Sequence, residues 1–164
     1  TLRFEGMNVQ VVSGSSFTDG TINGTGNLII GYNELRGSGD DRTGSHMLVI
    51  GKEHNYSSYG GMVAGRNNEA SARYASVSGG YGNTASGYYA SVSGGRNNTA
   101  SDYYASVSGG GYNTASDGYA SVSGGGSNTA SGLAASVSGG LNKKAETDYC
   151  IVGDDGVDCI APPP

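Results

Sequence analysis

Hydrophobic and polar residues alternate in a fixed fifteen-residue rhythm between Ala75 and Tyr149. Five consecutive copies begin with A-S-V-S-G-G, and the first four continue to N-T-A-S. Because side chains alternate between the two faces of a strand, Ala75 and Val77 share one face and the two serines share the other. In N-T-A-S the alanine points away from its Thr and Ser neighbours. The pattern predicts two short strands per copy, with one Val and two Ala turned inward.

Such a short fixed period is typical of a solenoid, in which each repeat stacks on its neighbours. Fifteen residues are too few for a helix pair or a propeller blade, but they match a coil of two strands and two turns stacked at about 4.8 Å. Gly79–Gly80 provides a turn that tolerates positive φ. Gly or Asp marks the second turn, at Gly87, Asp102, Asp117 and Gly132. The sequence predicts an all-β fold, a β-solenoid of fifteen-residue coils.

The whole chain divides into three parts. L-I-I-G at 28–31 recurs as L-V-I-G at 48–51 and, more loosely, M-V-A-G at 62–65, so the early coils are degenerate copies. Residues 1–47 are predicted to form N-terminal cap strands, including one over Met7–Val12, with a projecting loop at 36–44. Residues 48–149 form the repeats, regular over 75–149, and 150–164 form a C-terminal cap and a proline tail.

The aliphatic interior of each coil is thin. Burying a Val contributes about 1.5–3 kcal/mol, whereas ordering each backbone residue costs about 1–2 kcal/mol. Ladders between coils offset much of that cost, but the balance favours further burial by association. The composition therefore predicts an oligomer.

One polar residue type, Asn, and one aromatic residue type, Tyr, recur at fixed positions of the coil. Asn recurs at one site, where stacked amides can form a structural hydrogen-bond ladder; the residues are Asn68, Asn83, Asn98, Asn113 and Asn128. Tyr recurs at the end of the coil, interrupted by Ala134. The column is interpreted either as an interface seal or as a protein- or carbohydrate-binding strip. The candidate binding residues are Tyr74, Tyr88, Tyr89, Tyr103, Tyr104 and Tyr119.

The charge and the hydrophobicity of the sequence exclude some classes of binding partner. The net charge of −5 argues against nucleic acid, because phosphate binding needs basic patches. No apolar run approaches the roughly 20 residues of a membrane-spanning helix, so no direct membrane insertion is expected. The chain begins at Thr1, and we expect it to be a piece of a longer protein.

Candidate chemistry is sparse. His46 and His54, with Asp40 and Asp41 nearby, fall short of the three or four converging ligands of a metal site, and surface or turn roles are expected for them. No cofactor motif or catalytic constellation appears, so an enzyme is not expected. Cys150 and Cys159 are disulfide candidates, which implies an oxidising compartment, although pairing between chains remains open.

Units of the form S-V-x-x-G-x-x-N-x-A-S-G resemble the head repeats of trimeric autotransporter adhesins of the Yersinia adhesin type. The matching segments run from 48–51 through the five copies, about two-thirds of the chain. The resemblance implies a left-handed parallel β-roll, a homotrimer, and an adhesive head exposed on a bacterial surface fibre. The family's usual period is fourteen residues, and its S-V-A-I-G is here S-V-S-G-G.

The predicted function is therefore a non-enzymatic, extracellular head at the bacterial cell surface that binds host matrix, a glycan or another surface. The alternative is an ice-binding solenoid. Its hydroxyl array would be the T-x-S series that begins at Thr84, Thr99, Thr114 and Thr129. Fifteen-residue left-handed solenoids with T-x-T rows resemble insect antifreeze folds.

Overall fold

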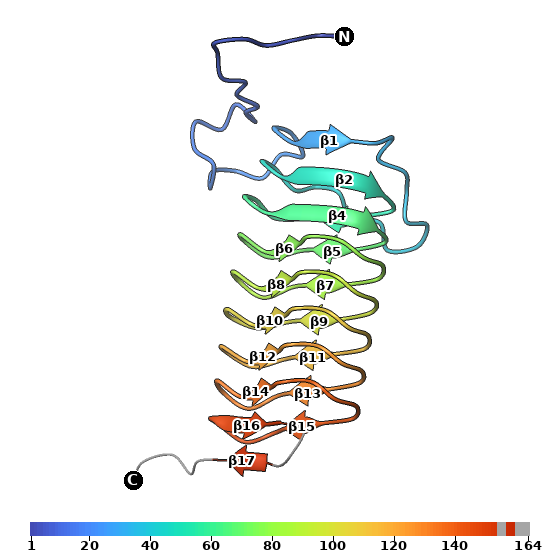
Figure 1. Ribbon diagram of the computed structural model, residues 1–164. Helices are drawn as coiled ribbons and strands as arrows, with labels where there is room; N and C mark the ends of the chain where they lie inside the picture. Colours follow the sequence, from blue (N-terminus) through green and yellow to red (C-terminus); the bar gives the residue numbers. More distant parts are fainter. Residues whose placement is uncertain (154–156, 160–164) are drawn as a thin grey trace.

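The computed structural model describes residues 1–153 and the backbone of 157–159, and these residues form strands and turns but no helix. The chain winds into a β-solenoid whose coils stack along one axis (Figure 1). Each regular coil contributes one two-residue strand to each of two sheets. The predicted all-β solenoid with fifteen-residue coils is confirmed.

The first sheet, sheet 1, has ten strands in the order β1-β2-β4-β6-β8-β10-β12-β14-β16-β17. Its neighbours pair in parallel except β16 and β17, which are antiparallel. The strands are β1 (Leu28–Ile30), β2 (Leu48–Lys52), β4 (Met62–Arg66), β6 (Ser76–Val77), β8 (Ser91–Val92), β10 (Ser106–Val107), β12 (Ser121–Val122), β14 (Ser136–Val137), β16 (Cys150–Val152) and β17 (Val157–Cys159).

The second sheet, sheet 2, has seven strands, all parallel, in the order β15-β13-β11-β9-β7-β5-β3. The strands are β3 (Asn55–Tyr56), β5 (Glu69–Ala70), β7 (Thr84–Ala85), β9 (Thr99–Ala100), β11 (Thr114–Ala115), β13 (Thr129–Ala130) and β15 (Lys144–Ala145). The register sets each residue beside its counterpart one repeat later, as in Val77 with Val92 and Thr84 with Thr99.

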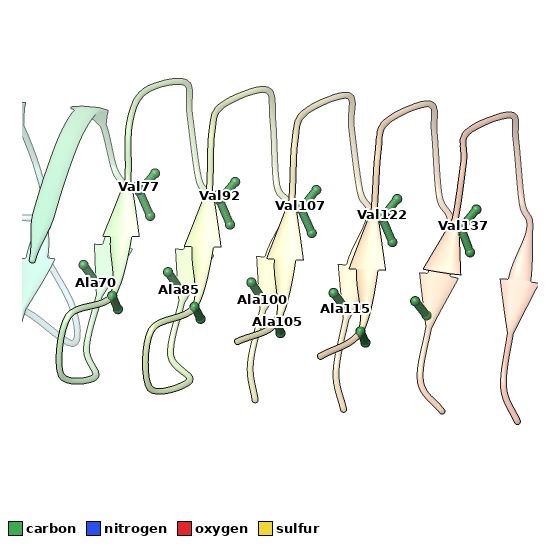
Figure 2. Close-up of a cluster of buried hydrophobic side chains, with 14 of the residues drawn as sticks. Ala70, Val77, Ala85, Val92, Ala100, Ala105, Val107, Ala115, Val122 and Val137 are labelled. Carbon is green, nitrogen blue, oxygen red and sulfur yellow. The ribbon is translucent and has the colours of Figure 1, made fainter. Parts of the chain in front are cut away.

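The core is a stack of small side chains between the two sheets. Val77 and its equivalents on sheet 1 and Ala85 and its equivalents on sheet 2 are at most 1% exposed over the regular repeats (Figure 2). Ala75 and its equivalents complete the core, as the alternation predicts. A thin, uniform core makes each coil depend on the coils above and below it.

Glycine is required where coils approach most closely. Gly110 has φ +80°, and a Cβ there would lie 2.1 Å from the carbonyl oxygen of Gly125 in the next coil. Its neighbour Gly109 has open space around it. In this coil only the second residue of the predicted Gly-Gly turn therefore needs to be glycine.

The N-terminal part differs from the prediction. Residues 7–12 form no strand, and β1 is the one strand between residues 1 and 47. The apolar segment 7–12 pairs with no strand of either sheet, and Val9 remains 61% exposed. The segment is attached through its Ser13 N–H, which donates to Nε2 of His46 at 3.0 Å.

The loop at 36–44 does not project. It runs along the end of sheet 2, where the Tyr56 N–H donates to the Asp41 carbonyl at 2.8 Å and the Asn55 side chain donates to the Gly39 carbonyl at 2.8 Å. Arg36 bonds Glu69 at 3.0 Å. Unpaired backbone groups at a sheet edge need partners, and this loop provides them for β3. It is the cap of sheet 2.

At the other end, β16 continues sheet 1 beside β14, and β17 turns back against β16. This register places Cys150 opposite Cys159 along the backbone. Cys150 is disulfide-bonded. The predicted proline tail lies outside the described residues.

Candidate functional site

The two sheets present different outward faces. On sheet 1 the outward residues of the regular coils are serines, which we call the serine face: Ser76, Ser78, Ser91, Ser93, Ser106, Ser108, Ser121, Ser123, Ser136 and Ser138. On sheet 2 they form the threonine face: Thr84, Ser86, Thr99, Ser101, Thr114, Ser116, Thr129 and Ser131. Both faces are arrays of small hydroxyl side chains, and they differ in their threonine content and in the residues at their ends.

Apolar residues bound the serine face at both ends. Met62 pairs in register with Ser76, Leu48 with Met62, and Leu28 with Leu48, so the outward serine row continues as a leucine and methionine row. At the opposite end Ile151 pairs with Ser136. Leu28 is 51% exposed and Ile151 is 46% exposed.

Charged residues bound the threonine face. Glu69 pairs in register with Thr84, and Lys144 pairs with Thr129. Lys144 also forms an exposed ion pair with Glu146 at 3.0 Å. Glu69 is half-buried in its ion pair with Arg36, so the threonine face ends in charged groups, unlike the serine face.

An open groove adds to the apolar surface at the N-terminal end. It has a volume of about 840 Å³ and lies between the segment 9–18 and sheet 1, with Leu28, Met47 and Leu48 in its lining. Leu28 and Leu48 belong to both the groove and the outward row that continues the serine face. The exposed apolar surface is thus contiguous.

The predicted tyrosine column is a stack of parallel rings along one edge. The centroids of Tyr74, Tyr89, Tyr104 and Tyr119 are 5.0–5.1 Å apart, with interplanar angles of 4–12°. Neighbouring rings cover one another's faces, so the column offers ring edges and hydroxyl groups to solvent. Burial raises the pKa of Tyr74, and nearby Tyr59 adds to the shift.

A second stack runs beside the first. Tyr88 stacks on Tyr103 at 5.0 Å, and the guanidinium of Arg73 lies 5.4 Å from the ring centroids of both Tyr59 and Tyr88. Tyr103 also contacts Tyr104 at 6.1 Å, which joins the two stacks. The structure thus brings together all six candidate binding tyrosines on one edge.

The tyrosines of the column have an unusual backbone conformation. Tyr74, Tyr89, Tyr104 and Tyr119 have φ of 55–60°, a left-handed conformation that bulky residues rarely adopt. The N–H of Tyr104 donates to the Tyr88 carbonyl at 3.0 Å, and its equivalents do the same along the column. This backbone ladder holds the tyrosines in a left-handed conformation that the sequence did not reveal.

The opposite edge carries aromatic residues that sequence reasoning missed. Arg66 lies 5.8 Å from the ring of Tyr81, and Arg96 lies 5.7 Å from the ring of Tyr112. Arg66, Tyr81 and Arg96 occupy the same site in successive coils and form parallel bridges. Alignment of the early, degenerate coils with the regular ones would have found them.

The asparagine row lies inside the solenoid and is fully buried. Oδ1 of Asn98 accepts the Asn113 N–H at 2.9 Å, while its Nδ2 donates to the carbonyls of Gly94 at 2.9 Å and Gly110 at 3.0 Å. The amides therefore bond backbone groups of their own and the next coil rather than one another. This row closes the turn of each coil and joins consecutive coils.

His54 occupies the same site one coil before Asn68, and it is buried rather than on the surface. Its Nδ1 accepts the Asn68 N–H at 3.2 Å, and Nε2 lies 3.0 Å from the Ile50 carbonyl. These two contacts fit the neutral imidazole, with its proton on Nε2. Burial lowers the pKa of His54, with smaller opposing contributions from its hydrogen bonds. The expected surface role is therefore wrong for His54, whereas its contacts with Ile50 and Asn68 agree with the expected turn role.

Among residues 1–153, no group of three or more His, Cys, Asp and Glu side chains is arranged to hold a metal ion. Within the same part of the chain no helix long and apolar enough to cross a bilayer occurs. The candidate chemistry of the described surface consists of flat hydroxyl faces and two aromatic edges.

No protein-family model matches the chain, and no curated protein matches it either.

Proposed function

We propose that three copies of this chain associate through their serine faces to form a non-enzymatic adhesive head of an extracellular bacterial fibre, each copy a left-handed β-roll. The observation that supports this best is the contrast between the ends of the two outward faces. Apolar residues continue the serine face at both ends, whereas charged residues continue the threonine face.

Association through the serine face would remove the exposed apolar row from water. Leu28 and Ile151 are both about half exposed in the single chain, and the groove beside Leu28 adds further apolar surface. Burial of such surface contributes about 25 cal/mol per Å². The serines between these apolar ends are small, so three flat sheets can approach closely.

In this trimer the threonine face points away from the other two chains. The tyrosine stacks lie along the edge of the solenoid between the serine face and the threonine face. Tyrosine is enriched at recognition surfaces, because it provides a large rigid contact area with a polar tip. We propose that these outward surfaces bind host matrix, a glycan or another surface. The strings that resemble adhesin head repeats support the same function.

Two matched arginine variants test the association. Ser106 lies in the middle of the serine face and Thr114 in the middle of the threonine face, both outward and in regular coils. Ser106→Arg would place three like charges against one another at the proposed interface and convert the trimer to a monomer. Thr114→Arg is expected to leave the solution mass unchanged. Equal effects of the two substitutions on mass would contradict the proposed interface.

Binding of the wild-type chain to immobilised matrix proteins and glycans, measured alongside both variants, tests the adhesive part. We expect binding by the trimer and a large loss of avidity in the Ser106→Arg monomer, because multivalent attachment exceeds the single-site affinity. Absence of binding to any such surface, with the trimer intact, would retain the assembly and exclude this adhesive function.

One observation favours ice binding as a second candidate. The threonine face is a regular array of hydroxyl groups, and those of Thr84, Thr99, Thr114 and Thr129 form no hydrogen bond within the described part of the chain. Freezing hysteresis at high protein concentration tests it. Activity that disappears in Thr114→Arg and persists in Ser106→Arg would establish this candidate, and no hysteresis in the wild-type chain would exclude it.

A further inference from the structure

The tyrosine column has one missing ring, at Ala134. Tyr119 lies one coil before this site and Tyr149 one coil after it. The backbone continues through all three residues without a break, with φ of 60° at Tyr119, 54° at Ala134 and 58° at Tyr149. The Ala134 N–H donates to the Gly118 carbonyl at 2.8 Å, and the Tyr149 N–H donates to the Leu133 carbonyl at 2.7 Å. The backbone of the column therefore stays in register through Ala134, but one aromatic ring is missing.

The space left by this missing ring has the thickness of one ring. Two coil steps separate the sites of Tyr119 and Tyr149, about 10 Å at the usual strand spacing. Tyr104 fits between Tyr89 and Tyr119 at centroid distances of 5.0 Å and 5.1 Å. A planar ring above Ala134 would meet both walls at the distances that the column already uses.

The exposure of Tyr119 agrees with an unfilled site on its side of the gap. Tyr119 is 61% exposed, whereas Tyr104, which has a ring on both sides, is 47% exposed and Tyr149 is 46% exposed. Among the described residues no ring contact reaches the face of Tyr119 that is turned toward Ala134, and Tyr149 has no ring neighbour. In the described part of the chain, the face of Tyr119 toward Ala134 and both faces of Tyr149 are therefore without a ring partner.

The side of the gap is apolar. Leu133 precedes Ala134 and lies under Gly118, where a Cβ would be 3.3 Å from its Cδ1. The Leu133 N–H is held by Oδ1 of Asp148 at 3.0 Å. Flat walls, an alanine floor, an aliphatic side and the nearby Asp148 carboxylate favour a flat, uncharged group over an anionic one.

We infer that the gap between Tyr119 and Tyr149 is a binding site for one aromatic side chain of a partner protein, which completes the tyrosine column on binding. The inference deepens the proposed adhesive function, on which its biological role rests, but the gap itself is formed by a single chain. Aromatic pairs prefer offset stacking with centroids 4.5–7 Å apart, and the spacing of the column lies in that range.

The test uses N-acetyl-tyrosine amide as the probe and the full chain with ¹³C-labelled tyrosine rings. We expect saturable shifts of the Tyr119 and Tyr149 ring signals by NMR, with little change at Tyr74. The same shifts in Ser106→Arg would show that the site does not depend on the trimer. Absence of shifts at Tyr119 in both proteins would overturn the inference, whatever the solution mass proves to be.

Two substitutions fill the gap from within. Ala134→Tyr supplies the missing ring and Ala134→Leu an aliphatic chain, and both are expected to abolish the probe-induced shifts. Ser127→Tyr is the matched control, because Ser127 has φ 55° on the opposite edge, one coil after Tyr112. It is expected to bind the probe as the wild type does. Probe binding that survives in folded Ala134→Tyr or Ala134→Leu would overturn the inference, as would stronger shifts with methyl glucoside than with the tyrosine amide.

Discussion

The buried asparagine row makes a quantitative prediction for Asn98→Ala. The substitution removes the acceptor of the Asn113 N–H and the donor to the Gly94 carbonyl, and no other hydrogen bond among the described residues reaches that carbonyl. The Gly110 carbonyl keeps the Arg96 N–H at 2.9 Å. The Asn113 N–H is buried and the Gly94 carbonyl is half-buried. A buried group left without a partner costs about 1–3 kcal/mol, so the free energy of unfolding is expected to fall by at least about 1–3 kcal/mol.

Chemical denaturation followed by circular dichroism, at one fixed protein concentration, measures this loss. Asn97→Gly is the matched control: Asn97 precedes Asn98, has φ 54°, and its side chain forms no hydrogen bond in the described structure. Glycine adopts that conformation readily, so a change below about 1 kcal/mol is expected. A loss for Asn98→Ala no larger than for Asn97→Gly would refute the stabilising role of the row.

Three further predictions concern single residues of the solenoid. Burial holds the pKa of His54 below its usual 6.5, so the stability that the neutral imidazole contributes is present above that pH and is lost as the pH falls toward the lower folded pKa. The melting temperature of the wild type should therefore fall more between about pH 7.5 and 5 than that of His54→Asn. Equal falls in the two proteins would contradict this. Gly110→Ala combines a left-handed φ with a close backbone contact and should destabilise by at least about 1–2 kcal/mol, whereas Gly109→Ala, with open space around it, should cost less than about 1 kcal/mol in the same denaturation experiment. Tyr104→Ala removes two stacked ring pairs and should lower the free energy of unfolding by about 1–3 kcal/mol. Tyr149→Ala removes no stacked pair in the described structure. Similar losses of stability in the two variants would show that ring stacking contributes nothing.

The regular coils were predictable because one local pattern repeats. The alternation in A-S-V-S and N-T-A-S assigns Val77 and Ala85 to the interior, and the constant period then fixes the register of every later coil. The stacking of the tyrosines follows from the same period. Their left-handed backbone does not, since that conformation depends on the N–H of each Tyr finding a carbonyl in the coil before it.

The N-terminal part lacks such a constraint. The alternation over 7–12 resembles that of a strand, but a strand also needs a neighbour to pair with, and that segment pairs with none. The charged loop at 36–44 looks solvent-exposed by composition, yet unpaired groups of β3 and the Arg36–Glu69 ion pair hold it against sheet 2. The burial of His54 was not predicted, because its place in the asparagine row can be recognised only once the degenerate early coils are aligned with the regular ones.

Native mass spectrometry of the unmodified chain tests the proposed assembly most directly. The proposal predicts a dominant species of three times the 16.4 kDa chain mass that persists after dilution. A species of the single-chain mass at all concentrations would contradict the trimer and leave both hydroxyl faces in solvent.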